Sequence, residues 1–85
     1  MRANKIEPLK LSLQQITDAT GEGMPTIYAA ITAGHLETFL VGRRRFARPE
    51  AVRAWVDYLE AESRKGRPVV YRSREIEAAA RNGRG

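Results

Sequence analysis

The spacer Gly21-Glu22-Gly23 separates two helical patterns and is long enough only for a tight turn. Upstream of it, Ser12 and Gln15 form a Ser-x-x-Gln capping box, in which each side chain bonds the other residue's backbone N–H at a helix N-terminus. Apolar residues then recur with a helical period, and Gly21 tolerates the left-handed conformation that ends many helices. The pattern predicts a first helix over residues 13–20.

A second helix is predicted to begin at Met24-Pro25. Proline suits the first turn of a helix, because the backbone N–H groups there have no intrahelical partner and nothing is lost when proline lacks one. Gly34 ends this helix, and His35 beyond it is expected at the surface. Two short helices joined by a glycine-containing turn form the helix-turn-helix pattern. The apolar face of the second helix carries Ile27, Ala30 and Ile31, and the opposite face carries Pro25, Tyr28, Ala29 and Thr32.

The next segment alternates between apolar and polar residues, which is typical of strands. Gly42-Arg43 suits a two-residue type II′ turn, and this register places Phe39 opposite Phe46 and Glu37 opposite Arg48. A looser loop from Gly42 to Arg45 leaves all three arginines at the tip, and the sequence leaves both turns open. In the tight register Arg43 and Arg45 point outward, whereas Arg44 shares the face of the two phenylalanines, which is expected to be the core side.

A third helix starts at Pro49 and is expected to fray around Arg64. Its buried stripe is predicted to be Val52, Trp55, Val56 and Leu59. The predicted organisation is an N-terminal arm over residues 1–10, one domain over residues 11–64 and a basic tail over residues 65–85. Within the tail, residues 69–71 suit a short extended piece, and Ser73 is placed to cap a short helix over residues 74–81.

Composition excludes most kinds of chemistry for a chain of 85 residues. It has no cysteine and one histidine, so disulfides, thiolate metal sites and a serine nucleophile with its base lack the residues that they need. We therefore expect no enzyme, no metal and no cofactor. No apolar run reaches the roughly 18 residues that suggest a membrane span, and no signal peptide opens the chain, which predicts a soluble cytoplasmic protein.

The charge is distributed unevenly along the chain. Residues 1–35 are balanced, residues 36–48 carry +3, residues 49–63 carry −3 and residues 64–85 carry +5. Two basic segments that flank an acidic helix are typical of a protein that binds a polyanion.

Several motifs follow one another in a defined order over residues 9–59. They are Leu11-Ser12, Gly21, Thr26-Ile27-Tyr28, Gly34 with Leu36, Val41-Gly42-Arg43-Arg44-Arg45, and Ala54-Trp55-Val56. In this order the chain resembles the excisionase and MerR-like winged helix-turn-helix family of phages and mobile elements. The resemblance implies a mainly α fold with a small β-hairpin wing, in the order helix, turn, helix, hairpin, helix, here followed by a basic tail.

The resemblance also implies that the second helix enters the major groove of duplex DNA and that the wing follows the minor groove. By position, the DNA-binding residues are Thr26, Tyr28, Ala29, Thr32, Arg43, Arg44 and Arg45. Additional contacts to DNA or to a neighbouring copy are expected from Met24, Pro25, Arg64, Lys65 and Arg67. Relatives usually carry a serine cap followed by basic residues at the start of this helix, where this chain has Gly23-Met24-Pro25. The chain therefore lacks, at these positions, the arginines that can recognise a guanine base through two hydrogen bonds.

The implied function is that of a recombination directionality factor, which bends attachment-site DNA and promotes excision by an integrase of the tyrosine or serine type. Cooperative head-to-tail self-association on DNA and a bacterial or phage origin come with this interpretation. A transcriptional regulator of the same fold is the first alternative. A protein-interaction adaptor whose basic tail binds an acidic partner is the second.

Overall fold

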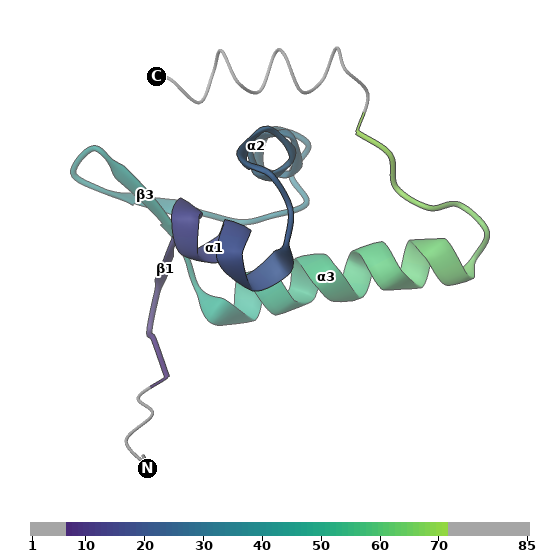
Figure 1. Ribbon diagram of the computed structural model, residues 1–85, viewed down its shortest axis with the longest axis horizontal. Coiled ribbons are helices and arrows are strands. Elements are labelled where there is room, and N and C mark those ends of the chain that lie inside the picture. Colours follow the sequence, from purple (N-terminus) through teal and green to yellow (C-terminus); the bar gives the residue numbers. More distant parts are fainter. Residues whose placement is uncertain (1–6, 72–85) are drawn as a thin grey trace.

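The computed structural model describes residues 7–71, which form three helices and a three-stranded antiparallel sheet (Figure 1). In chain order the elements are β1 (Leu11–Ser12), α1 (Leu13–Thr20), α2 (Met24–Thr32), β2 (Phe39–Val41), β3 (Arg44–Ala47) and α3 (Pro49–Arg64). The three helices and the hairpin were all predicted. The helix predicted over residues 74–81 lies outside the described residues.

The capping box predicted for α1 is confirmed. The backbone N–H of Gln15 donates to Ser12 Oγ at 3.1 Å, and the Gln15 side chain accepts from the Ser12 N–H at 2.8 Å. At the other end, Gly21 adopts a left-handed conformation with φ of 79° and donates its N–H to the Thr17 carbonyl oxygen at 2.9 Å. Gly23 stands at the N-cap of α2 and provides no side-chain cap.

The hairpin has the tight turn, with Phe39 opposite Phe46 and Val41 opposite Arg44. A type II′ turn requires a positive φ at its first central residue and not at its second. Gly42 has a φ of 62°, and Arg43, like every other non-glycine residue of the range 7–71, has no positive φ. The looser loop is therefore wrong. The expected pairing of Glu37 with Arg48 is also not found, because Arg48 Nε lies 3.7 Å from the carboxylate of Glu50 at the start of α3.

A third strand, β1, was not predicted. Leu11 pairs with Ala47 and Ser12 pairs with Phe46, so β3 lies in the middle of the order β1-β3-β2. The strand is two residues long and runs directly into α1, so it is too short to show an alternating pattern of its own. Its pairing ties the hairpin to the start of α1.

The core is built from buried side chains of every helix together with β3 and the segment that follows α2. Its members are Leu13, Ile16, Ile27, Ala30, Leu36, Ala47, Val52 and Trp55. Trp55 is fully buried, as predicted, and Leu59 packs against the cluster. Val56 was predicted to be buried but is 44% exposed, because it points into an open groove beside α3.

The chain after α3 returns toward the core instead of running into solvent (Figure 1). Residues 69–71 form no strand, but the hydroxyl of Tyr71 accepts a hydrogen bond from Trp55 Nε1 at 3.0 Å and lies 2.8 Å from His35 Nδ1. The ring of His35 also packs against Tyr58 at a centroid distance of 4.7 Å. His35 is consequently half-buried and not the surface residue that was expected.

Candidate nucleic-acid interface

The ion pairs divide the cationic side chains into two groups. Residues 7–71 contain nine lysines and arginines, and five of them pair with glutamates. These five are Arg48, Arg53, Arg64, Lys65 and Arg67, which lie on α3 or beside its ends. The other four make no ion pair with a described residue, and we call them the sheet cations: Lys10, Arg43, Arg44 and Arg45.

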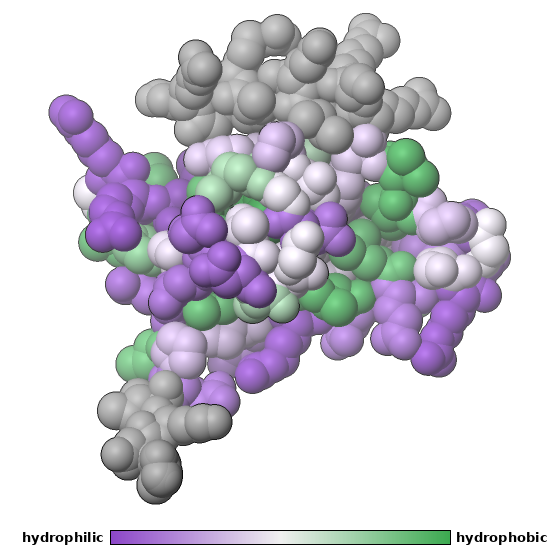
Figure 2. Space-filling view, in the orientation of Figure 1, coloured by the Kyte–Doolittle hydropathy of each residue, from purple (hydrophilic) through white to green (hydrophobic). Residues whose placement is uncertain are grey.

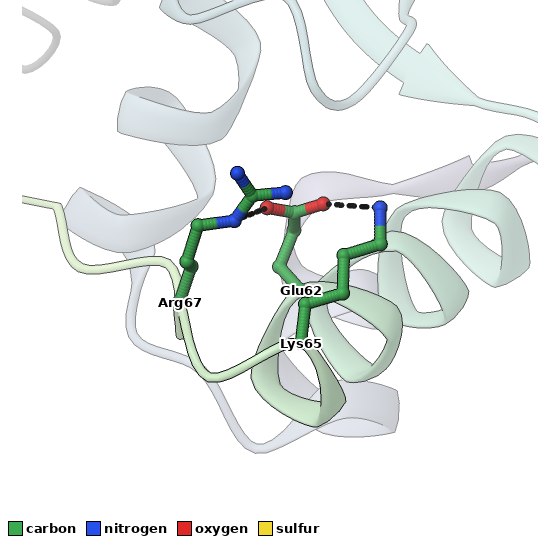
Figure 3. A network of polar contacts seen from close by, with 3 residues as sticks. All are labelled: Glu62, Lys65 and Arg67. Atoms are coloured by element: carbon green, nitrogen blue, oxygen red, sulfur yellow. Dashed lines mark hydrogen bonds and ion pairs between the residues drawn. The ribbon is translucent and has the colours of Figure 1, made fainter.

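The cations predicted to extend the site beyond α3 are already neutralised locally. Glu62 lies between Lys65 and Arg67, with ion-pair distances of 3.2 Å and 3.8 Å (Figure 3). The Glu62 side chain is only 18% exposed, which reduces the screening of these pairs by solvent. Arg64 donates to Glu60 at 2.7 Å. These three cations therefore offer less free positive charge to a polyanion than the sheet cations do.

The sheet cations gather around the hairpin. Lys10 immediately precedes β1, Arg43 completes the turn between β2 and β3, and the other two belong to β3. Figure 2 shows hydrophilic residues over the projecting hairpin, at the left of the view. Because no carboxylate of residues 7–71 forms an ion pair with these four cations, this end of the described structure presents positive charge to solvent.

Aromatic rings hold two of these cations on one face of the sheet. Lys10 Nζ lies 3.9 Å from the centroid of the Phe46 ring, and Arg44 Cζ lies 5.3 Å from the same centroid. Phe39 completes the cluster at a centroid distance of 6.2 Å from Phe46, which confirms the predicted cross-strand pair. A cation over an aromatic face is attracted by the ring quadrupole and needs no anion nearby. Lys10 and Arg44 are thus positioned while their charges stay available.

Lys10 was not among the predicted DNA-binding residues, because it was assigned to the N-terminal arm. It reaches Phe46 because β1 pairs with β3, and that pairing spans 34 to 36 positions of the chain. The sequence offered one signal, a lysine directly before the strand-like residues Leu11 and Ser12.

The expected orientations of Arg44 and Arg45 require correction. The core lies on the face of Ala47 and not on the face of Phe46, so Arg44 points away from the core and is exposed. Arg45 shares the Ala47 face, is half-buried and donates from Nη1 to Thr38 Oγ1 at 2.7 Å. Arg45, and not Arg44, is therefore the most restrained of the three hairpin arginines.

The candidate residues of α2 are less accessible than the helical pattern suggested. Ala29 is 1% exposed, so its methyl group does not face solvent as predicted. Tyr28 was placed on the face opposite the core but is half-buried and packs against the core cluster, as does Met24. Thr26 is half-buried too. The exposed candidates on α2 are Pro25 and Thr32.

A groove beside α3 is lined by both apolar and charged side chains. It has a volume of about 560 Å³ and is lined by apolar side chains that include Leu11, Val52 and Val56. Its charged rim includes Glu7 and Arg53, which pair with each other at 3.5 Å. Residues 7–71 contain no cluster of three metal-ligating side chains, and none of their helices is long and apolar enough to cross a membrane.

Comparison of the chain with protein-family models, with curated proteins and with solved structures found no match. The resemblance to excisionases therefore depends on the motifs of this sequence alone.

Proposed function

We propose that the protein binds duplex DNA through its hairpin and acts as an excisionase-type recombination directionality factor. The main support for DNA binding is that the cations fall into two groups, those that pair with glutamates and those that do not. The four sheet cations make no ion pair with another described residue, whereas the five cations on or beside α3 are paired with glutamates. Cations without a local carboxylate partner, gathered around a hairpin, suit the phosphates of DNA and the negative potential of a narrow minor groove.

Most of the affinity then comes from phosphates and DNA shape. The exposed candidates on α2 are a proline and a threonine, neither of which forms the paired hydrogen bonds by which arginine or asparagine reads a base. A protein with such a surface binds many sequences and selects among them by how easily they bend. Bending of DNA at attachment sites is the activity that excisionases supply, and the order of motifs in this chain favours that role.

Within this proposal the partners are duplex DNA, neighbouring copies bound head to tail, and an integrase of the tyrosine or serine class. The protein itself catalyses nothing. It shapes the DNA so that the recombinase acts on it.

The salt dependence of binding tests the interface. Each neutralised phosphate contributes about −0.9 to the slope of log K against log salt on B-DNA, so Lys10→Ala combined with Arg43→Ala should flatten the slope by about 1.8. The matched control removes two paired cations, Arg53→Ala with Arg64→Ala, and should leave the slope nearly unchanged. Equal slopes for all three proteins would remove the hairpin from the interface.

The recombination role needs a second assay. A multi-site attachment fragment should bend when the protein binds, and excision by the cognate integrase should increase. Binding and bending without any change in excision would favour the transcriptional regulator instead. Binding to an acidic protein with no salt-sensitive binding to duplex DNA would favour the adaptor.

A further inference from the structure

Strand β2 lies at an edge of the sheet and carries three apolar side chains that are all exposed. Phe39, Leu40 and Val41 are 36%, 57% and 52% exposed. The order β1-β3-β2 gives β2 a hydrogen-bonded neighbour on one side only. Edge strands in natural proteins are usually protected from pairing with another chain by charges, prolines, bulges or a very short length. β2 has no charge or proline, and its three residues limit the edge to a short pairing.

The backbone groups of β2 that face the free edge of the sheet belong to Leu40. In a two-residue hairpin the residues next to the turn, here Val41 and Arg44, form a hydrogen-bonded pair. Pairs alternate along an antiparallel ladder, so the pair of Leu40 with Arg45 is not hydrogen-bonded. The N–H and C=O groups of Leu40 therefore point away from β3, toward the open edge.

We propose that the occupant of this edge is β2 of a second copy of the chain, paired antiparallel about a two-fold axis at Leu40. In that register Leu40 lies opposite its own counterpart, and Phe39 lies opposite Val41 of the second copy. An interface of this kind presents the same patch from both subunits. The two sheets become one continuous sheet of six strands.

The charges that flank β2 fit this register. Counting outward from Leu40, Glu37 of one copy comes beside the turn that ends β2 of the other copy, within reach of the long side chain of Arg43 at that turn, and the symmetry produces this contact twice. Both side chains are exposed, and neither makes an ion pair with another described residue. The parallel register at the same edge would place like residues side by side, so the charge pattern selects the antiparallel one.

The symmetry has a consequence for the face that carries Phe46. A two-fold axis perpendicular to the sheet keeps equivalent faces on the same side, so Lys10 and Arg44 of both copies lie on one surface. Self-association thus doubles the length of the basic face. It takes place without DNA, so its failure would leave binding of DNA by a single copy untouched.

Sedimentation equilibrium of the free protein over a series of concentrations tests the pairing. The wild-type chain should dimerise weakly, because a three-residue edge buries far less than a standard interface. Glu37→Arg and Arg43→Glu should each weaken the dimer by about tenfold, since each replaces two attractions by two repulsions. The double variant E37R/R43E should return to the wild-type association constant, because the pairs are restored with reversed sign.

Two substitutions make the result specific. Leu40→Lys should abolish the dimer, whereas Leu9→Lys, at a residue 75% exposed and outside β2, should not. Glu22→Arg controls for the change in net charge. The proposal is overturned if the wild-type chain stays monomeric at about 1 mM. It is equally overturned if E37R behaves like Glu22→Arg, or if the double variant fails to recover.

Discussion

The indole N–H of Trp55 is fully buried and donates its hydrogen bond to the hydroxyl of Tyr71, sixteen residues further along the chain. The same hydroxyl lies within hydrogen-bonding distance of His35 Nδ1. One phenol thereby joins the segment after α3 to the largest core residue and to the end of the helical pair. Part of the predicted tail is in this way packed on the core.

Tyr71→Phe should destabilise the protein by about 1–3 kcal/mol, because it leaves the buried indole N–H of Trp55 without this acceptor. Urea denaturation followed by the fluorescence of this one tryptophan measures the change. Tyr58→Phe is the matched control, since the hydroxyl of Tyr58 makes no hydrogen bond with another described residue. Equal stabilities for the two variants would show that the Tyr71 hydroxyl contributes nothing.

Gly23→Ser should stabilise the protein by about 0.5–1 kcal/mol. Gly23 has φ and ψ of −73° and 161°, nearly those of Ser12, whose side chain caps α1 at −73° and 166°. A serine there would accept from the N–H of Thr26, because Pro25 has none to offer. Thermal unfolding measures the gain.

The same substitution two residues earlier should have the opposite sign. Gly21 has a φ of 79°, so Gly21→Ser should cost about 1–2 kcal/mol although no atom lies near the added Cβ. Similar unfolding temperatures for the two variants would contradict the assignment of the two caps.

Ala29→Arg should destabilise the protein by at least about 1–3 kcal/mol, because Ala29 is 1% exposed and a large charged side chain has no room there. Thr32→Arg, on the face that the helical pattern assigned to DNA, should change stability by less than about 0.5 kcal/mol, because Thr32 is exposed. Chemical denaturation compares the two. An Ala29→Arg protein as stable as wild type would restore Ala29 to the list of accessible candidates.

Glu62→Gln should tighten DNA binding and steepen the salt slope, by about 0.9 for each cation that then reaches a phosphate. The reason is that Glu62 neutralises both Lys65 and Arg67. Glu22→Gln makes the same change in net charge at a residue that forms no ion pair with another described residue, and it controls for the charge. If the two variants tighten binding equally, only the overall charge matters, and the role of Glu62 is disproved.

The parts of the fold that were foreseen depend on short stretches of chain. The capping box at Ser12, the stop at Gly21 and the tight turn at Gly42 each need four or five residues, and the structure has all three. Alternation in the hairpin also gave the correct register. It did not show which face is inward, because Phe46 looks more core-like than Ala47 and only the packing of the helices decides between them.

The parts that were missed depend on distant contacts. Lys10 joins the candidate site through β1, and Tyr71 reaches back to Trp55 and His35. The number of cations near the end of α3 can be counted in the sequence. Their pairing with glutamates cannot, because it depends on where the side chains of Glu60 and Glu62 point. A count of charges therefore does not show how much unpaired positive charge the segment after α3 presents.

A single residue, Arg48, connects β3 to α3, and β1 fastens β3 from its other side. We therefore expect the hairpin to move together with α3. A load on the turn is then expected to be transmitted along β3 to α3, which is anchored in the core by the buried indole of Trp55. If the hairpin grips DNA, the nucleic acid must yield to the shape of the protein, and stiffness of this kind is what a DNA-bending factor needs.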